Sequence, residues 1–537
     1  MTVSKSSLQL AVKNMQFFGD TDVFPRPFEL LAVKEQEDKF IQLLEELDAN
    51  FDAWFVKHSP TNIRAQSAVG YHGFRAATQI DVPWNAYLLA LVIEIGEELE
   101  AERVSTSNDT VYSYRLALDA TRGTLFDSSI GWQAFNEKSV SLAETSSHVL
   151  VTDIADFYSR IYHHRLENAL KKIEGANPEV VRRIVILVSS IAGVVSYGLP
   201  VGGPAARLLS ELLLNRVDRL LLAGGIQFIR FVDDYRIFAT DEEHAYRSLV
   251  SLSDFLLRNE GLTLNRSKTR ILTRHDFLAT SAFTADERAE SAEEAELRDF
   301  LKLRLKYDPY SPTADEDYDK LLSELMRFDI VGLLMREIRK SRIDERVTRQ
   351  LLQSIKLLSP STRNAAIESL VDNLIVLYPV FPSVMTVLLA SYDDLTKVIQ
   401  GKVFSALKDL ISKNSYITQV PANLAFALRV LAFDRSEECD AVLSQLYQST
   451  TDMMVRRDLI YVMAYRDSEW WLSNLKNSYS MLTMWERRAM VVASYILQDE
   501  GRHWRDSVKS GFDPYTSFLR DWAAASKNQN GSLSIRP

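Results

Sequence analysis

The strongest constraint on the fold is a change in the pattern of apolar residues along the chain. Strand-like segments alternate with long helical segments in the first part, whereas every apolar pattern after about residue 320 has a helical period. Such an order predicts an α+β domain followed by an all-α domain. We assign residues 1–300 to the first domain and 301–537 to the second, because the acidic stretch Asp286–Glu296 and the polar stretch Ser311–Asp319 lie near this boundary.

Within the first domain, the spacing of apolar residues predicts both helices and strands. Helices are expected at Lys39–Ala49, Trp84–Glu102, Ser159–Glu174, Asn177–Val195, 202–222 and Glu242–Asn259. Strands are expected at Val111–Leu118, at His148–Thr152, and twice within Ile226–Ala239, where Asp233 and Asp234 would form a tight turn.

The second domain shows weak internal repetition. Val455–Ile460 and Glu486–Val491 align at a spacing of 31 residues, each with paired arginines ahead of apolar residues. Ser359–Leu370 has a similar Arg-then-apolar start but does not fix a period. The pattern suggests an array of α-helical repeats, and a plain helical bundle stays open as the alternative.

Composition excludes several classes of protein. With 46% apolar and 25% charged residues the chain is globular, and the single cysteine, Cys439, excludes an intrachain disulfide or a cysteine-based zinc site. A net charge of −10 argues against a protein that coats nucleic acid, although a local basic channel remains possible. The sequence has neither an apolar run long enough for a membrane span nor a signal-peptide core, so we expect a cytoplasmic protein without a membrane partner.

Carboxylates stand at the ends of predicted strands in two segments of the first domain. In HVLVTDIADFYSRI an apolar strand ends at Asp153, and FIRFVDDYRI carries adjacent carboxylates at its predicted turn, Asp233 and Asp234. Between these segments a Gly/Pro loop, GLPVGGP, leads into a helix. Alone, an Asp at a strand end is commonly a helix N-cap or a solvated turn residue. The order of the three segments together favours a shared site.

Such a site suits magnesium. Nucleotidyl transfer uses two divalent ions about 4 Å apart, which activate a hydroxyl and stabilise the leaving pyrophosphate. Magnesium prefers a few carboxylate oxygens together with substrate phosphates. Asp153 and Asp233 would bridge the ions, and Asp234 would be a weaker third ligand.

Four segments in this order resemble the palm of reverse transcriptases. DIADFY is similar to the first catalytic motif of that family, GLPVGGP to its template and nucleotide loop, FVDD to its Tyr-x-Asp-Asp box, and GLTLNRSKT to the motif that follows. The resemblance implies a right-hand polymerase domain with fingers and palm. Such a domain synthesises DNA from dNTPs with Mg²⁺.

The resemblance also implies roles for individual residues. Asp153 and Asp233 would hold the magnesium ions, with Asp234 assisting. Tyr158 would be the aromatic gate that excludes a 2′-hydroxyl, or else a core aromatic, and Phe157 beside it would also bind substrate.

Further roles concern the triphosphate and the base pair. Asp156 would face the triphosphate, or be a solvated turn residue, and Lys268 would neutralise the leaving pyrophosphate, or be an ordinary exposed lysine. Arg115, one of many arginines, could be the triphosphate-binding residue of the fingers. The backbone at Val201 and Gly202 would line the incoming base pair, where glycine permits close approach.

Several residues depart from the usual reverse transcriptase pattern and indicate which subgroup of the family the chain resembles. Val201 stands where most members carry Gln, Phe231 where they carry Tyr, and Arg207 and Glu211 where retrons and intron enzymes usually have Pro and Asn. In this the chain looks like the bacterial abortive-infection and defence-associated reverse transcriptases. These similarly join a reverse-transcriptase half to a C-terminal helical domain, often of HEAT-like repeats, and the resemblance favours a homo-oligomer.

Three functions remain open from the sequence. The first is an antiphage polymerase that makes single-stranded DNA without a template from a Tyr hydroxyl of the protein itself, so that the product is covalently attached. The second is a templated reverse transcriptase that copies an associated non-coding RNA. The third is a non-catalytic scaffold that binds a phage protein, although adjacent carboxylates at one turn repel each other and have no purpose in a scaffold.

Overall fold

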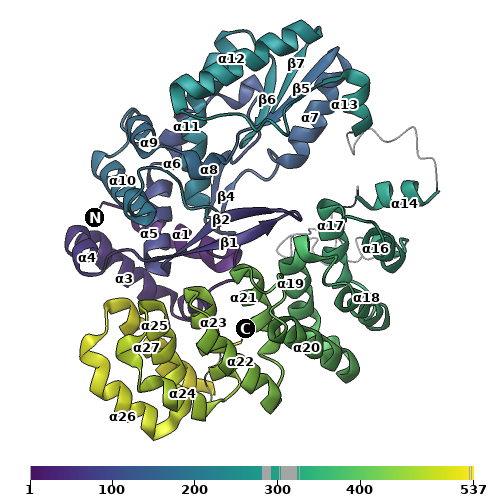
Figure 1. The fold of residues 1–537 in the computed structure, drawn as a ribbon. Coiled ribbons are helices and arrows are strands. Elements are labelled where there is room, and N and C mark those ends of the chain that lie inside the picture. The colour runs from purple at the N-terminus through teal and green to yellow at the C-terminus, as the bar shows by residue number, and fades with distance from the viewer. Residues whose placement is uncertain are drawn as a thin grey trace. The chain divides into compact units, whose positions relative to one another are not determined.

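The computed structural model describes residues 2–280, 292–301, 303, 323–325, 327–530, 533 and 535–536. Ser311–Asp319 and most of Asp286–Glu296, which we used to place the domain boundary, lie outside these residues. The chain divides into two compact units (Figure 1). The first unit comprises Met1–Asp22, Glu29–Arg64 and Ala77–Arg288, and the second unit comprises Val23–Phe28, Ala65–Ala76 and Ala289–Pro537.

The centre of the first unit is a four-stranded antiparallel sheet of order β6-β7-β5-β8. Its strands are β5 (His148–Asp153), β6 (Phe228–Phe231), β7 (Asp234–Ala239) and β8 (Arg270–Thr273). The register pairs His148 with Ala239 and Asp153 with Asp234. The predicted strands at 148–152 and 226–239 are therefore confirmed, and the sheet brings their Asp-bearing ends together.

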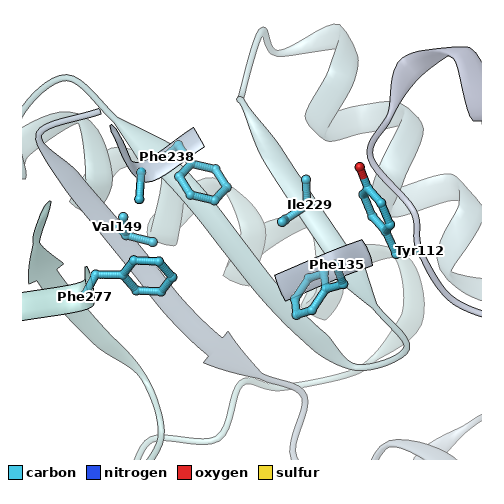
Figure 2. Close-up of a cluster of buried hydrophobic side chains, with 7 residues drawn as sticks. Tyr112, Phe135, Val149, Ile229, Phe238 and Phe277 are labelled. Carbon is cyan, nitrogen blue, oxygen red and sulfur yellow. The ribbon is translucent and has the colours of Figure 1, made fainter. Parts of the chain in front are cut away.

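Aromatic side chains pack one face of this sheet (Figure 2). Phe135 from α7 (Trp132–Glu144) and Phe277 from α13 (Arg274–Thr280) cluster with Val149 and Phe238 of the neighbouring strands β5 and β7. Each is at most 5% exposed, so the cluster contributes roughly 1.5–3 kcal/mol per side chain to stability. Helix α12 (Glu242–Glu260) also packs on β5 and β7.

Helices make up most of the rest of the first unit (Figure 1). They are α1 (Lys5–Phe18), α2 (Glu29–Glu35), α3 (Glu37–Ala49), α4 (Phe51–Lys57), α5 (Val82–Glu94), α6 (Gly96–Glu102), α8 (Phe157–Arg160), α9 (His163–Leu170), α10 (Pro178–Ala192) and α11 (Pro204–Ala223). The helix expected at 84–102 is two helices, broken at Ile95, and α5 is buried on all faces rather than amphipathic because α1, α10 and α11 pack around it.

The strand expected at Val111–Leu118 is mostly wrong. Only Leu116–Asp119 forms a strand, β3, which pairs with β4 (Thr124–Phe126). The extended run is interrupted because Tyr114 adopts φ 47°, which turns the backbone out of the β region. The sequence patterns also missed a two-stranded sheet of β1 (Asn62–Val69) and β2 (Gly73–Ile80).

The described part of the second unit contains helices and no strand beyond residue 292. Its longer helices are α14 (Ala292–Leu301), α16 (Ile330–Ile338), α17 (Glu345–Ile355), α18 (Pro360–Asp372), α19 (Phe381–Ser391), α20 (Lys397–Ser412), α21 (Pro421–Leu431), α22 (Glu437–Ser449), α23 (Met453–Tyr465), α24 (Glu469–Lys476), α25 (Met484–Ala493), α26 (Gln498–Val508) and α27 (Pro514–Asn530). Neither unit has, among the described residues, a helix that could cross a membrane.

Contacts in the second unit link alternate helices into two rows. One row runs through α17, α19, α21, α23, α25 and α27, and the other through α16, α18, α20 and α22. Arg457 and Arg488, 31 residues apart, both lie over an aromatic ring of the next helix in their row, Trp485 at 5.4 Å and Tyr515 at 4.9 Å. The spacing of 31 seen in the sequence thus corresponds to equivalent packing positions.

Glu260, at the end of α12, predicts a measurable pH dependence of stability. Burial raises the pKa of its carboxyl to about 7, and Arg165 at 3.9 Å offsets this only in part. Because the folded pKa exceeds the unfolded value, the stabilisation is present at low pH and lost as pH rises through 7. The difference in free energy of unfolding between Glu260→Gln and wild type should therefore shift in favour of the variant by about 2 kcal/mol from pH 5 to pH 8. Urea unfolding at both pH values measures this shift. A difference that does not change with pH would show that Glu260 is ordinary in the folded state.

Candidate active site

Strand pairing brings the three predicted carboxylates to one end of the sheet. Asp153 is the last residue of β5 and lies directly opposite Asp234, the first residue of β7. Asp233 precedes it in the turn. The turn itself is Val232–Asp233 rather than the expected Asp233–Asp234, because Asp234 already pairs within the sheet and Val232 takes the left-handed φ of 55°. A β-branched residue rarely adopts this conformation, so the surroundings must hold it there.

Negative charge is concentrated at this end of the sheet. Burial, followed by the charges of Asp233 and Asp153, raises the pKa of the Asp234 carboxyl to about 6. Asp153 is buried, and its Oδ1 has no hydrogen-bond partner among the described residues. Crowded, desolvated carboxylates of this kind stabilise a bound cation.

Lys268 supplies a cation to these carboxylates. Its Nζ lies 2.5 Å from Asp153 Oδ2, and this hydrogen bond raises the pKa of the Lys268 ammonium. The segment before it is joined to β5, since Asn265 N donates to the Asp153 carbonyl at 2.8 Å. The position of Lys268 is therefore consistent with the prediction that it lies at the site, and its side chain is 65% exposed.

The donor set fits hard divalent ions such as magnesium. Carboxylate oxygens are the right chemistry, and the unpartnered Oδ1 of Asp153 and the raised pKa of Asp234 are the signs of a site short of positive charge. Within the described residues, no three carboxylate, imidazole or thiol side chains are gathered closely enough to hold a metal by themselves. Substrate phosphates commonly complete such sites, so Asp153, Asp233 and Asp234 would be the protein's share of the ligands.

Two aromatic residues follow the first carboxylate on α8. Tyr158 is half-buried, and its carbonyl accepts a hydrogen bond from Leu199 N at 2.8 Å, which joins it to the Gly/Pro loop. Burial raises the pKa of the Tyr158 hydroxyl, so it stays protonated. Phe157 is only 3% exposed and packs against Tyr158 at 5.3 Å between ring centroids. The expectation that Phe157 binds substrate is therefore wrong, because its ring belongs to the core.

The loop that contains Val201 and Gly202 lies against the N-terminal segment. Gly202 has φ 116°, and a Cβ there would come within 2.1 Å of Thr21 Oγ1. Val201 is partly exposed beside it, and Asp156, also exposed, adopts φ 50° ahead of α8. The close approach that the structure shows at this glycine is to Thr21, and the expected approach to a base pair stays a prediction.

Gly202→Ala should disturb the loop strongly. The substitution combines a backbone conformation that L residues rarely adopt with a clash against buried Thr21, so we expect a loss of about 2–4 kcal/mol in stability. Gly131→Ala is the matched control, because its φ is negative and nothing lies within 4 Å of the new methyl group. Thermal or urea unfolding of both variants measures the difference, and equal midpoints would contradict the strained loop.

The structure contradicts the role expected for Arg115. Its side chain is 3% exposed, with Nη1 donating to Glu100 at 2.9 Å and Nη2 to the Val104 carbonyl at 2.7 Å. A guanidinium held in this way cannot reach a triphosphate. The charge of a different arginine, Arg207, acts on the Tyr158 hydroxyl. Arg207 bonds Asp22 at 2.6 Å and lies over the Tyr114 ring at 5.2 Å.

A buried ion network beneath the turn escaped the sequence analysis. Arg230, on β6, donates to Asp218 at 2.6 Å and to Glu211 at 3.0 Å, both on α11, and Arg103 donates to Glu211 at 2.8 Å. All four side chains are at most 2% exposed. The signal was present, because Glu211 and Asp218 are seven residues apart on one helix face and Arg230 interrupts an apolar strand.

This network reaches the catalytic turn directly. Arg230 Nη1 donates to the Val232 carbonyl at 2.8 Å, in addition to its bonds with the two carboxylates. Val232 is the residue with the left-handed φ, and it immediately precedes Asp233. The network therefore fixes the turn that presents Asp233 and Asp234.

The comparison with known families covers the same residues. The family described as "Reverse transcriptase (RNA-dependent DNA polymerase)" matches residues 108–298, which include the three carboxylates and Lys268. No curated protein matches the sequence.

Telomerases are among the solved structures with some likeness to this chain. Apo telomerase from Candida tropicalis has 10% identity and a TM-score of 0.30, with 78% of this chain and 74% of that chain covered. Telomerase from Candida albicans in complex with a fragment of telomeric RNA has 11% identity and a TM-score of 0.28, with 74% and 66% covered. Likeness at this level says nothing about the activity of the present chain.

Proposed function

We propose that this chain, whose residues 108–298 match the reverse transcriptase family, is a magnesium-dependent enzyme that joins dNTPs into DNA. The pairing of Asp153 with Asp234 across β5 and β7, with Asp233 at the adjoining turn, carries the proposal. These carboxylates would hold the divalent ions. When bound, the ions lower the pKa of the attacking hydroxyl and neutralise the leaving pyrophosphate.

The chain's own side chains would then orient the substrate and supply a proton. Lys268 is protonated at neutral pH, and its exposed side chain can leave Asp153 to neutralise or protonate the pyrophosphate. Tyr158, tied to the loop through Leu199, would lie under the sugar, and the Val201–Gly202 backbone would line the base pair. Asp156 would face the triphosphate.

We further propose that the enzyme acts in antiphage defence by abortive infection. Its DNA would be single-stranded, made without a template, and attached to a Tyr hydroxyl of the protein. Val201, Phe231 and Arg207, which depart from the usual family pattern, support this proposal. Residues 1–300 would form the fingers and palm, and a HEAT-like array over 301–537 would join copies into a homo-oligomer. The two rows of helices in the second unit favour such an array.

Analysis of the purified chain tests both the polymerase activity and the attachment of its DNA to a tyrosine of the protein. Denaturing gels with and without DNase should show covalent DNA on wild type and none on Asp233→Asn. Incubation with labelled dNTPs should add label with magnesium and none with a chelator. After nuclease digestion, mass spectrometry would locate the nucleotide-bearing tyrosine.

The sequence of the DNA separates the alternatives. Random sequence that forms without RNA supports untemplated synthesis, whereas repeated sequence that requires a co-expressed non-coding RNA supports templated copying. A chain that carries no DNA, and that adds none with either metal or RNA, would be a scaffold instead.

A further inference from the structure

A groove separate from the candidate active site lies in the first unit, where the α8–α9 junction, Tyr197 and the end of α12 meet. Its volume is about 480 Å³, and none of the three predicted carboxylates lines it. The residues that decide its chemistry are three arginines, two tyrosines and one glutamate: Arg160, Arg165, Arg258, Tyr162, Tyr197 and Glu260.

The charge of the groove is positive in a chain that is acidic overall. Arg160 is exposed. Arg258 is 77% exposed and bonds Asp254 at 2.6 Å. Arg165 lies 3.9 Å from Glu260, the one acid in the lining. With Asp254 counted as well as Glu260, three guanidinium groups face two carboxylates. The surplus is one positive charge, on Arg160, and guanidinium geometry suits phosphate.

Two aromatic rings stand beside these arginines. Tyr162 is 46% exposed and Tyr197 49% exposed, although rings of this size are usually covered. Their backbones form an antiparallel bridge, and His163 N donates to the Ser196 carbonyl at 3.0 Å. The rings are thus presented from a fixed backbone. An exposed ring beside arginines is the pairing on which nucleic-acid bases stack.

The backbone of the groove is continuous with that of the candidate active site. Gly198 N donates to the Ile161 carbonyl at 2.7 Å, and Leu199 N donates to the Tyr158 carbonyl at 2.8 Å. Ala155 N donates to the Thr263 carbonyl at 2.9 Å, two residues beyond the groove's Gly261. A ligand in the groove would therefore lie on the segments that also carry Asp153 and Tyr158.

We propose that this groove binds a nucleotide, with the arginines on phosphate and Tyr162 or Tyr197 on the base. The nucleotide belongs either to a nucleic-acid strand or to a free nucleoside triphosphate. This inference rests on the proposed function only in that the domain handles nucleic acid, and binding in the groove requires no catalysis.

Fluorescence anisotropy in EDTA tests the groove separately from polymerisation. The probes are a labelled single-stranded oligothymidine and labelled ATP. Every variant is made in the Asp233→Asn full chain, which should carry no product DNA whether or not the wild type makes any. Tyr197→Ala should weaken binding about tenfold, whereas Tyr197→Phe keeps the ring face and should bind as the parent does. For the oligonucleotide, log affinity falls as log salt concentration rises. The double variant Arg160→Ala/Arg258→Ala should make this slope shallower by about 1.4, because two phosphate contacts are lost.

Arg247→Ala is the matched control, because Arg247 is an exposed arginine on α12 outside the groove. Loss confined to the oligonucleotide would identify a strand as the ligand, and loss confined to ATP would identify a free nucleotide; both support the groove. The proposal is overturned if Tyr197→Ala and the double arginine variant bind both probes as tightly as Arg247→Ala. Failure of wild type to make DNA would refute the proposed function and leave this result unaffected.

Discussion

Asp233→Asn is expected to reduce nucleotide incorporation at least about a thousandfold, which corresponds to about 4 kcal/mol of transition-state stabilisation. The turn places Asp233 next to Asp234 and opposite the end of β5, so its carboxylate is one of three that share the site. The amide keeps the shape of the side chain and removes the charge that holds divalent ions. Incorporation of labelled dNTP with magnesium measures the effect.

Two further variants sharpen this experiment. Asp234→Asn should lose less activity, because Asp234 would be the weaker third ligand of the ions that Asp153 and Asp233 bridge. Asp467→Asn removes an exposed aspartate of the second unit that also lies in a left-handed turn, and it should keep full activity. If Asp233→Asn retained a tenth or more of the wild-type rate, the carboxylates would not be the metal ligands.

Arg230→Met should be the most destabilising single change in the domain, by about 3–5 kcal/mol. The substitution leaves Asp218 buried without its partner, while Glu211 keeps Arg103. Burial already raises the pKa of Asp218 even with Arg230 present, so the unpaired carboxylate would be costly. Urea unfolding measures the loss.

The double variant Arg230→Met/Asp218→Asn separates stability from positioning. Removing the stranded charge should restore at least half of the lost stability. Activity should stay low, because neither substitution restores the hydrogen bond from Arg230 to the Val232 carbonyl that holds the left-handed turn. Recovery of activity together with stability would show that Arg230 contributes only to folding.

Local patterns were enough to place much of the candidate site. A strand that ends at Asp153 and a hairpin that carries Asp233 and Asp234 can be recognised from a few consecutive residues, and antiparallel pairing then brings them together. Lys268 lies beside Asp153, because the short segment Asn265–Lys268 is joined to β5 by the Asn265 hydrogen bond, and its role in the reaction stays a prediction.

Residues whose surroundings come from distant segments were misjudged. Arg115 looked like a free cation, yet Glu100 and the Val104 carbonyl enclose it. Phe157 looked like part of a substrate surface, yet it is buried in the core. Burial depends on what packs against a side chain, and a single position carries no information about that.

The sequence by itself determined the α+β first half, the helical second half and the carboxylates that we propose as ligands of a divalent ion, because strand period, helix period and carboxylate chemistry are local properties. The tertiary structure alone decided that Val232 occupies the turn, that Arg230 secures it, and that arginines and tyrosines from three segments share a groove. Each of these depends on contacts between residues far apart in the chain. Such contacts form, and stabilise the structure, only once the sheet and α11 have come together.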